Sequence, residues 1–221
     1  MLVFYIFSSK MYELYKNWIR NFVNYFRRMA LQKRVTSKQI ARLPLIFYSG
    51  EIVVVKDVSA AKLAVEALLA EKFLGFDIES KPAFRKGESY PPSLLQIAGQ
   101  KRVYLFMLGK TGGIETLKPI LENATIWKVG IAISYDIQNL FKLEKFAARG
   151  FYDLAELSRK LKVAHTGLRN LAAIFLRGRI SKGSQLTDWS QETLTPQQIS
   201  YAATDAWASR EIFLQMAKYL D

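Results

Sequence analysis

The chain has 221 residues, of which 50% are hydrophobic and 13% aromatic, so it is long and apolar enough to fold around one buried core and is not a disordered protein. Its 32 Lys and Arg exceed its 19 Asp and Glu by a net charge of +13, which favours a polyanionic partner, either nucleic acid or an anionic membrane surface. Having no cysteine and a single histidine, it lacks disulfides, thiolate metal sites and histidine clusters, which favours a cytoplasmic protein whose metals, if any, are held by oxygen.

Residues 1–28 differ from the rest of the chain in being rich in aromatic side chains. From Lys10 onward apolar residues recur at helical spacing opposite basic ones, which predicts a basic amphipathic helix. Such a helix lies on an anionic membrane, packs on the core or supports self-association. A further alternative is that translation begins at Met29. We therefore divide the chain into an N-terminal extension, 1–28, and a main domain, 29–221, whose core spans about 52–220.

The first part of the main domain predicts short elements leading to an acidic strand. Thr36 or Ser37 caps a short helix that ends before Pro44, and residues 45–48 and 51–55 predict a hairpin turned at Ser49-Gly50. Asp57 or Ser59 then caps a helix that continues to Glu71. The strand Phe73–Ser80 follows directly.

This strand carries two acids one residue apart, Asp77 and Glu79. Successive side chains of a strand point to opposite faces, so these two carboxylates share a face. Like charges this close repel, and one of them takes up a proton unless a cation lies between them. Taken alone, the pattern also fits a strand end that runs into solvent.

The remaining elements alternate strands with helices, which predicts a mixed α/β sheet. They are expected in this order: a loop over 81–92, a hairpin of strands 93–98 and 102–107, a helix over 114–122, a strand over 125–130, a helix carrying Asp136, a strand over 151–153 opening into a helix that ends at Leu161, a helix over 168–176, a flexible basic loop over 177–185, and a long final helix that begins at Thr195-Pro196.

On the final helix Tyr201 and Asp205 are four residues apart and therefore neighbours on one face. Three or four carboxylates that converge without a histidine make a site for two divalent cations, Mg²⁺ or Mn²⁺, of the kind that braces both the attacking and the leaving oxygen of a phosphodiester. A tyrosine beside such a site positions the attacking water.

Three motifs together resemble the exonuclease motifs of the DEDD superfamily, in its tyrosine-bearing subgroup: Phe76-Asp77-Ile78-Glu79, Asp136 and Leu140 after Gly130, and Tyr201-Ala202-Ala203-Thr204-Asp205. The wording of Gly75 to Ser80 with Leu95-Gln96-Ile97, and of Asp188-Trp189-Ser190, is most similar to the Werner-type 3′–5′ exonuclease domain. The resemblance implies an RNase H-like fold, whose five-stranded mixed sheet has one antiparallel strand and is flanked by helices. It also implies hydrolysis of 3′-terminal nucleotides by two metal ions, which releases nucleoside 5′-monophosphates.

The resemblance also implies a role for each matching residue. Asp77 would bridge both metals, Glu79 and Asp205 would complete one site, Asp136 would hold the second metal, and Tyr201 would orient the attacking water. Ala132 and Tyr135 depart from the small residues, often glycine, of the Werner-type wording, so Tyr135 narrows the cleft or stacks on a base.

The basic loops and one tryptophan are the remaining candidates for contact with nucleic acid. Arg85, Lys86, Arg177, Arg179 and Lys182 are placed to hold phosphates, and Trp189 beside them to stack on a base. The Werner-type resemblance favours DNA over RNA as the substrate. The alternatives are an enzyme that trims RNA 3′ ends as RNase D does, a nucleic-acid-binding module without catalysis, and a membrane-surface adaptor built on residues 1–28.

Overall fold

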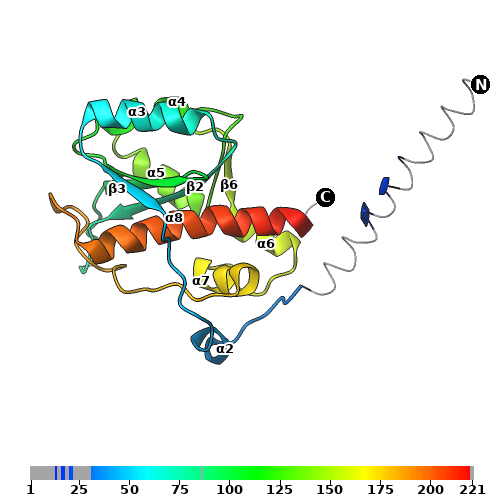
Figure 1. Cartoon of the computed structure of the whole chain (residues 1–221). Helices are drawn as coiled ribbons and strands as arrows, with labels where there is room; N and C mark the ends of the chain where they lie inside the picture. The colour runs from blue at the N-terminus through cyan, green and yellow to red at the C-terminus, as the bar shows by residue number, and fades with distance from the viewer. Residues whose placement is uncertain (1–12, 14–15, 18–19, 22–30, 86, 220–221) are drawn as a thin grey trace, which may run out of the picture.

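The computed structural model describes residues 13, 16, 17, 20, 21, 31–85 and 87–219 (Figure 1). The amphipathic helix predicted over the N-terminal extension, and the proposals for its contacts, lie almost entirely outside these residues, as does Lys86. Within the described part of the chain, no helix has the length and apolar character needed to cross a bilayer.

The centre of the fold is a mixed sheet of six strands in the order β1-β4-β3-β2-β5-β6. Neighbouring strands are parallel except where β3 pairs with β2 and β4, so the single antiparallel strand implied by the resemblance is present. The sheet has six strands, however, rather than the expected five. The strands are β1 Glu51–Val55, β2 Phe73–Ser80, β3 Pro92–Ala98, β4 Arg102–Met107, β5 Trp127–Gly130 and β6 Phe151–Asp153.

The hairpin predicted between residues 45–48 and 51–55 is wrong. β1 instead pairs in parallel with β4, and Arg102 on β4 forms an ion pair with Glu51 at 2.7 Å. Residues 45–48 run beside a distant loop, where Leu45 forms a parallel bridge with Arg179 and the Ile46 N–H donates to the Arg179 carbonyl at 2.9 Å. The Ser49-Gly50 turn signal is local, whereas the partner of β1 is decided by a strand about 50 residues later in the chain.

The helices begin where their capping residues predict. Thr36 and Thr195 each form a capping box with a glutamine three residues later, and Asp57 caps its helix by accepting from the Ala60 N–H. The predicted helix over 168–176 is divided into an α-helical turn and a π-helical segment. The helices are α2 Ser37–Ala41, α3 Val58–Leu69, α4 Gly113–Leu121, α5 Ile133–Leu140, α6 Leu154–Lys160, α7 Leu168–Leu171 followed by the π-helix Ala172–Leu176, and α8 Pro196–Met216 followed by a 3₁₀ turn, Ala217–Tyr219.

The elements form three layers (Figure 1). One core cluster packs α3 and α4 on one face of the sheet, around Phe76, Leu95 and Phe106. Two other clusters pack the long α8 on the opposite face, one of them beside β3 and β4 and the other beside α6 and α7. A residue of β2 that points toward α8 therefore lies between the central strand and the C-terminal helix.

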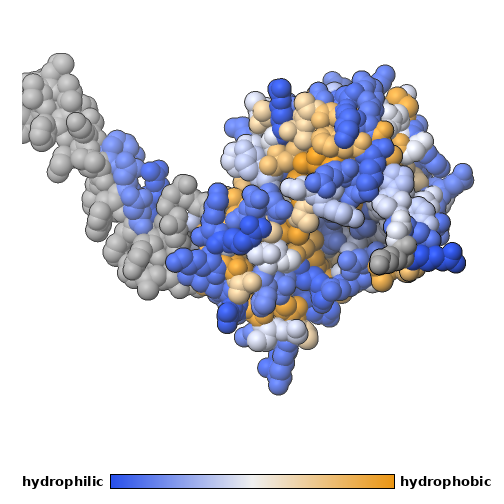
Figure 2. Space-filling model, turned by 180° about the vertical axis from the view of Figure 1, so that it is seen from behind, coloured by the Kyte–Doolittle hydropathy of each residue, from blue (hydrophilic) through white to orange (hydrophobic). Residues whose placement is uncertain are grey.

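The surface of the back view is a mixture of hydrophilic and hydrophobic side chains (Figure 2). Its largest hydrophobic area, in orange, lies in the upper half, which is the half that carries α3 and α4. Helix α3 itself has three exposed large apolar residues, Val58 at 41%, Leu63 at 68% and Leu69 at 41%. Scattered apolar residues of this kind are normal on a folded domain and do not mark a site.

Candidate active site

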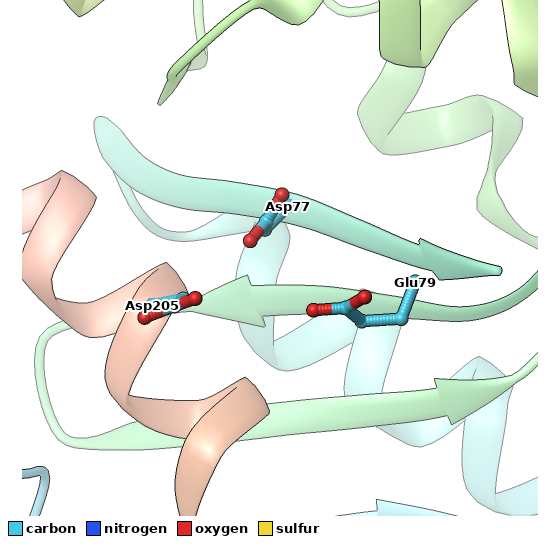
Figure 3. A group of neighbouring side chains, drawn as sticks. All are labelled: Asp77, Glu79 and Asp205. Atoms are coloured by element: carbon cyan, nitrogen blue, oxygen red, sulfur yellow. The ribbon is translucent and has the colours of Figure 1, made fainter. Parts of the chain in front are cut away.

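Three carboxylates from two distant segments converge between β2 and α8 (Figure 3). Asp77 and Glu79 extend from β2 toward Asp205 on α8, and one oxygen from each of the three residues lies within 4.8 Å of the others. Asp77 and Glu79 are partly buried, and Asp205 is 7% exposed. The alternation of the strand thus places the first two acids on the face that α8 covers, as the sequence predicted.

The close packing of α8 on β2 depends on Gly75. A Cβ atom added at Gly75 would lie 1.9 Å from the carbonyl oxygen of Ala206, so the helix backbone contacts the strand where a side chain is missing. One turn later, the Arg210 Nε donates to the Phe73 carbonyl at 3.1 Å. Because Asp205 precedes Ala206, this contact sets the distance between Asp205 and the two acids of β2.

Asp136 approaches the same region from the first turn of α5. It is 7% exposed, and its Oδ2 has no hydrogen-bond partner. Burial, and after it the negative charge of Asp77, raises the pKa of Asp136, so its carboxylate lies near enough to Asp77 to be affected by that charge, although Asp136 lies outside the group of three. Ala132 is the N-cap residue just before this helix, and its φ is +58°, in the left-handed region that favours glycine. The left-handed backbone at residue 132 explains why glycine would suit this position, where this chain has Ala132.

The pKa values of the four acids are all raised, because the carboxyl groups are buried together. Burial raises the pKa of Asp77 to about 7. The Ile78 N–H has a smaller, opposite effect, because it donates a hydrogen bond to Asp77 Oδ1 at 3.0 Å and so lowers the pKa. Burial and then the charges of Asp77, Asp205 and Asp136 raise the pKa of Glu79 to about 10.

The other two acids behave in the same way. Burial, then Asp77 and Asp153, raise the pKa of Asp136 to about 9. Burial, then Asp77, raise that of Asp205 well above its ordinary value, while the Tyr201 hydroxyl lowers it. No Lys or Arg of the described ranges forms an ion pair with any of the four. These oxygens therefore lack the positive charge that would keep them ionised at neutral pH.

Tyr201 lies one helical turn before Asp205, and its ring packs on Trp189 with 6.0 Å between centroids. Burial, followed by the charges of Asp205 and Glu79, raises the pKa of its hydroxyl, so this group stays protonated and can donate or accept a hydrogen bond. Trp189 itself is 1% exposed in the cluster beneath α8. The prediction that Trp189 stacks on a base is therefore wrong, because both faces of its ring are covered by the core.

Three of the four acids line a cavity of about 590 Å³, and Asp136 is not among its lining residues. Asp77, Glu79, Tyr201 and Asp205 form one side of it. The other side comes from α2, from the start of α7 and from the loop after the π-helix; these residues include Ile40, Arg169, Asn170 and Lys182. Arg169 is a cation that the sequence did not single out, and its Nε is buried without a hydrogen-bond partner.

The other predicted nucleic-acid contacts lie elsewhere. Arg179 donates from Nε to the Leu43 carbonyl at 3.1 Å and does not line this cavity, so its contact with phosphate stays a prediction. Arg177 lines a different cavity, beside Arg42. Arg85 is exposed in the loop after β2, and Tyr135 is 66% exposed on α5, so both are open to a ligand but do not line this cavity.

A buried glutamine, Gln96, is a further polar residue of this region that the sequence did not single out. Gln96 on β3 stands opposite Asp77 in the antiparallel register and is fully buried, with neither its amide nitrogen nor its amide oxygen paired. Its motif was part of the family resemblance, but the sequence gives no sign of a buried, unpaired amide beside the acids.

Comparison with known proteins places this geometry in a family. A family model described as 3′–5′ exonuclease matches residues 52–221. The Mus musculus protein named bifunctional 3′–5′ exonuclease/ATP-dependent helicase WRN is 28% identical over 189 residues, which cover 81% of this chain and 14% of that protein. The chain thus corresponds to a small part of this relative.

Two solved structures have the same fold. The crystal structure of the Aedes aegypti Nibbler EXO domain gives a TM-score of 0.71 at 21% identity, covering 79% of this chain and 92% of that one. Escherichia coli RNase D, described as an exoribonuclease involved in structured RNA processing, gives a TM-score of 0.65 at 20% identity, covering 76% of this chain and 45% of that one. At these identities the likeness concerns the fold.

Proposed function

Because the chain belongs to the 3′–5′ exonuclease family, we propose that it hydrolyses the 3′-terminal phosphodiester of a nucleic acid strand with two divalent cations, Mg²⁺ or Mn²⁺, held by Asp77, Glu79, Asp136 and Asp205. The observation that carries this proposal is the convergence of three carboxylate oxygens within 4.8 Å, with no ion pair to a Lys or Arg among the residues that the structure describes. An all-oxygen donor set suits these hard cations.

The electrostatics of the site support a bound cation. Acids with pKa values raised to about 7 and about 9, as for Asp77 and Asp136, are not all ionised at neutral pH unless positive charge is added. The buried, unpaired Oδ2 of Asp136 is a lone-pair donor without a partner, which is costly unless a ligand occupies it. Cations bound here would polarise the phosphate and stabilise the charge that develops on the attacking and leaving oxygens.

The residues of the chain then have separable tasks. The acids would hold the two cations, which would supply the positive charge that positions and polarises the phosphodiester. Tyr201, whose raised pKa keeps it protonated, orients the attacking water by hydrogen bonding and does not deprotonate it. The water oxygen bonds to phosphorus and releases a proton to solvent, the bond from phosphorus to the 3′ oxygen of the preceding nucleotide breaks, and that oxygen takes up a proton from solvent. The released product is a nucleoside 5′-monophosphate.

The basic side of the cleft suits the phosphates of the same strand. Arg169 and Lys182 line the cavity across from the acids, and Arg169 has a buried Nε without a partner. Arg85, which is exposed in the loop after β2, is a third cation that we propose contacts the strand outside this cavity. Replacing these three residues by alanine is expected to weaken binding of every sequence and to flatten its salt dependence.

We propose DNA as the substrate on the ground of the Werner-type resemblance of the sequence motifs; a relative that matches 81% of this chain is named bifunctional 3′–5′ exonuclease/ATP-dependent helicase WRN. The likeness to RNase D supports the alternative of RNA 3′-end trimming only through the fold. Rates on DNA and RNA oligonucleotides of matched sequence and length separate the two. Faster hydrolysis of the RNA strand would reverse the choice of substrate and leave the site unchanged.

The test of the site is Asp77→Asn, with Glu66→Gln as the matched control on an exposed face of α3. We expect the wild-type chain to release mononucleotides from a 3′ end with Mg²⁺ or Mn²⁺, to stop when chelator is added, and to lose activity and metal binding with Asp77→Asn only. Binding of Mn²⁺ followed by calorimetry provides the second measurement. Undiminished hydrolysis in chelator, or an active Asp77→Asn protein, would contradict the proposal.

A further inference from the structure

The buried polar atoms that lack a partner gather around the active site. Among the described residues, the buried side-chain nitrogen and oxygen atoms without a hydrogen-bond partner belong to Gln96, Asp136, Arg169 and Trp189. Asp136 is one of the four acids, Arg169 lines the cleft, and the Trp189 ring packs on Tyr201. Gln96 has two such atoms, Nε2 and Oε1, and the proposed function gives this residue no role.

Gln96 lies on the face of the sheet that carries the acids. Its Cα pairs with that of Asp77 in the antiparallel register of β2 and β3. Residues that stand directly opposite in such a pair share a face, with about 4.5–5.5 Å between their Cβ atoms. The neighbours of Gln96 on β3 agree, because Leu95 belongs to the core cluster around α3 and α4, whereas Leu94 belongs to a cluster on the α8 side. The Gln96 side chain therefore lies beside that of Asp77.

Within the sheet, the acids are the polar side chains that adjoin the Gln96 amide. On its other side Gln96 stands opposite Leu105 of β4, and its neighbours along β3 on this face are apolar. Across β2, the residues diagonal to it are Gly75, which has no side chain, and Glu79. Asp77, directly opposite, accepts at Oδ1 from the Ile78 N–H at 3.0 Å and has a second oxygen, Oδ2, to offer.

We propose that Gln96 is a positioning residue whose amide N–H donates to the Asp77 carboxylate and fixes its orientation toward the bound cations. The inference rests on the proposed function, since it takes Asp77 to be a metal ligand. An ionised carboxylate only accepts hydrogen bonds, and an amide nitrogen has two to donate. Both ends of the Gln96 amide are unpaired, so its nitrogen can turn toward Asp77 without giving up another hydrogen bond.

The experiment replaces the amide by apolar groups and measures metal binding and stability separately. Mn²⁺ affinity of Gln96→Met and Gln96→Leu is measured by calorimetry, and melting temperatures are measured in chelator. Residues that orient a metal ligand are typically worth about 10–100-fold in metal affinity, and we expect both variants to lose that much. The metal-free melting temperature should stay the same or rise, because two buried polar atoms without partners are removed.

The rate of hydrolysis gives a second measurement on the same variants. The Mn²⁺ concentration that supports half of the maximal rate should rise by the same 10–100-fold factor as the Mn²⁺ dissociation constant. Saturating Mn²⁺ should restore the wild-type rate, because the orientation of a metal ligand is changed and the reacting groups are not.

The matched control is Gln198→Met on α8, since Gln198 is also buried, at 3% exposed, but its amide is paired at both ends. Its Nε2 donates to the Thr187 hydroxyl at 3.1 Å and to the Asp188 carbonyl at 3.0 Å. Its Oε1 accepts from the Thr195 N–H at 2.9 Å. We expect Gln198→Met to lower the melting temperature in chelator and to bind Mn²⁺ as wild type does.

Three results would overturn the inference. The first is wild-type Mn²⁺ affinity in either Gln96 variant, because the two share only the loss of the amide. The second is weaker binding together with a lowered melting temperature in chelator, since Gln96 would then stabilise the core as Gln198 does. The third is a rate that saturating Mn²⁺ does not restore.

The two proposals fail separately. Metal-dependent hydrolysis by the wild type, with unchanged Mn²⁺ affinity in the Gln96 variants, leaves the function standing without the positioning residue. Weakened Mn²⁺ binding by these variants, in a chain that hydrolyses no strand, leaves the effect of Gln96 on the metal site standing without the exonuclease. A wild type that binds no Mn²⁺ overturns both.

Discussion

Replacing Gly75 by alanine tests whether the contact between β2 and α8 assembles the site. The new Cβ would lie 1.9 Å from the Ala206 carbonyl oxygen and 2.8 Å from its carbonyl carbon, whereas Cβ contacts below 3.0 Å are essentially never seen. The helix must therefore withdraw by at least 1.1 Å at this point. Asp205 is the adjacent residue and Tyr201 lies one turn earlier, so the displacement is transmitted to both.

The size of the effect follows from this displacement. Overpacking of a core costs about 1–3 kcal/mol, which for a domain of this size lowers the melting temperature by roughly 2–12 °C. A misplacement of about 1 Å costs on the order of 10²-fold in rate. We therefore expect Gly75→Ala to fold with a lowered melting temperature, to bind Mn²⁺ more weakly and to hydrolyse a labelled oligonucleotide about 100-fold more slowly in single turnover.

The matched control is Gly109→Ala, because a Cβ at Gly109 meets no atom within 4 Å. It should retain the rate, the metal affinity and the melting temperature of wild type. A Gly75→Ala protein with wild-type turnover and melting temperature would show that α8 is not fixed against β2 by this contact, and the account of how Asp205 is positioned would be wrong.

Three other predictions concern single groups. Tyr201→Phe should reduce turnover by no more than about 10²–10⁴-fold, while Mn²⁺ binding measured by calorimetry stays intact. Asp205→Asn should lose both turnover and metal binding. Equal loss of metal binding in the two variants would refute their separate roles. Burial raises the pKa of Asp77 to about 7 and of Asp136 to about 9, so the folded state keeps protons that the unfolded chain releases near pH 4. The melting temperature measured in chelator should therefore fall as pH rises from about 5 to about 9, and added Mg²⁺ should raise the melting temperature more at the higher pH. A melting temperature in chelator that does not change with pH would contradict the shared burial of the acids. Because Ala132 has φ of +58°, Ala132→Gly should leave the free energy of unfolding unchanged or raise it by up to about 1 kcal/mol. The control Ala67→Gly in α3 should lower the free energy of unfolding by about 1 kcal/mol in the same denaturant titration. An equal decrease in both variants would argue against the left-handed conformation of Ala132.

The acids could be grouped from the sequence because their placement depends on local periodicity. A strand puts Asp77 and Glu79 on one face whatever surrounds it, and a helix puts Tyr201 and Asp205 on one face in the same way. The helix starts at Thr36, Asp57 and Thr195 were predicted for a similar reason, since a capping side chain bonds to a backbone N–H within three residues.

Long-range packing decided the features that the sequence missed. A two-residue turn signal could not show that β1 pairs with β4, leaving residues 45–48 to contact the loop around Arg179. The sequence did not show that the Nε of Arg179 donates to the Leu43 carbonyl, which ties this basic residue to the segment before β1. Trp189 lies beside a basic loop in the chain, yet α8 and the sheet enclose it. In each case the partner is distant in sequence, where residue type and spacing carry no signal.

The distance between the two halves of the site is likewise a tertiary property. The sequence supplies acids on β2 and on α8, but it is the missing side chain at Gly75, against the carbonyl of Ala206, that lets the strand and the helix approach until their carboxylates lie within 4.8 Å. The position of Gln96 beside Asp77 has the same origin, because the antiparallel register of β2 and β3 brings the two residues opposite each other. Local periodicity fixes which face a side chain occupies, and only contacts between distant segments fix what that face meets.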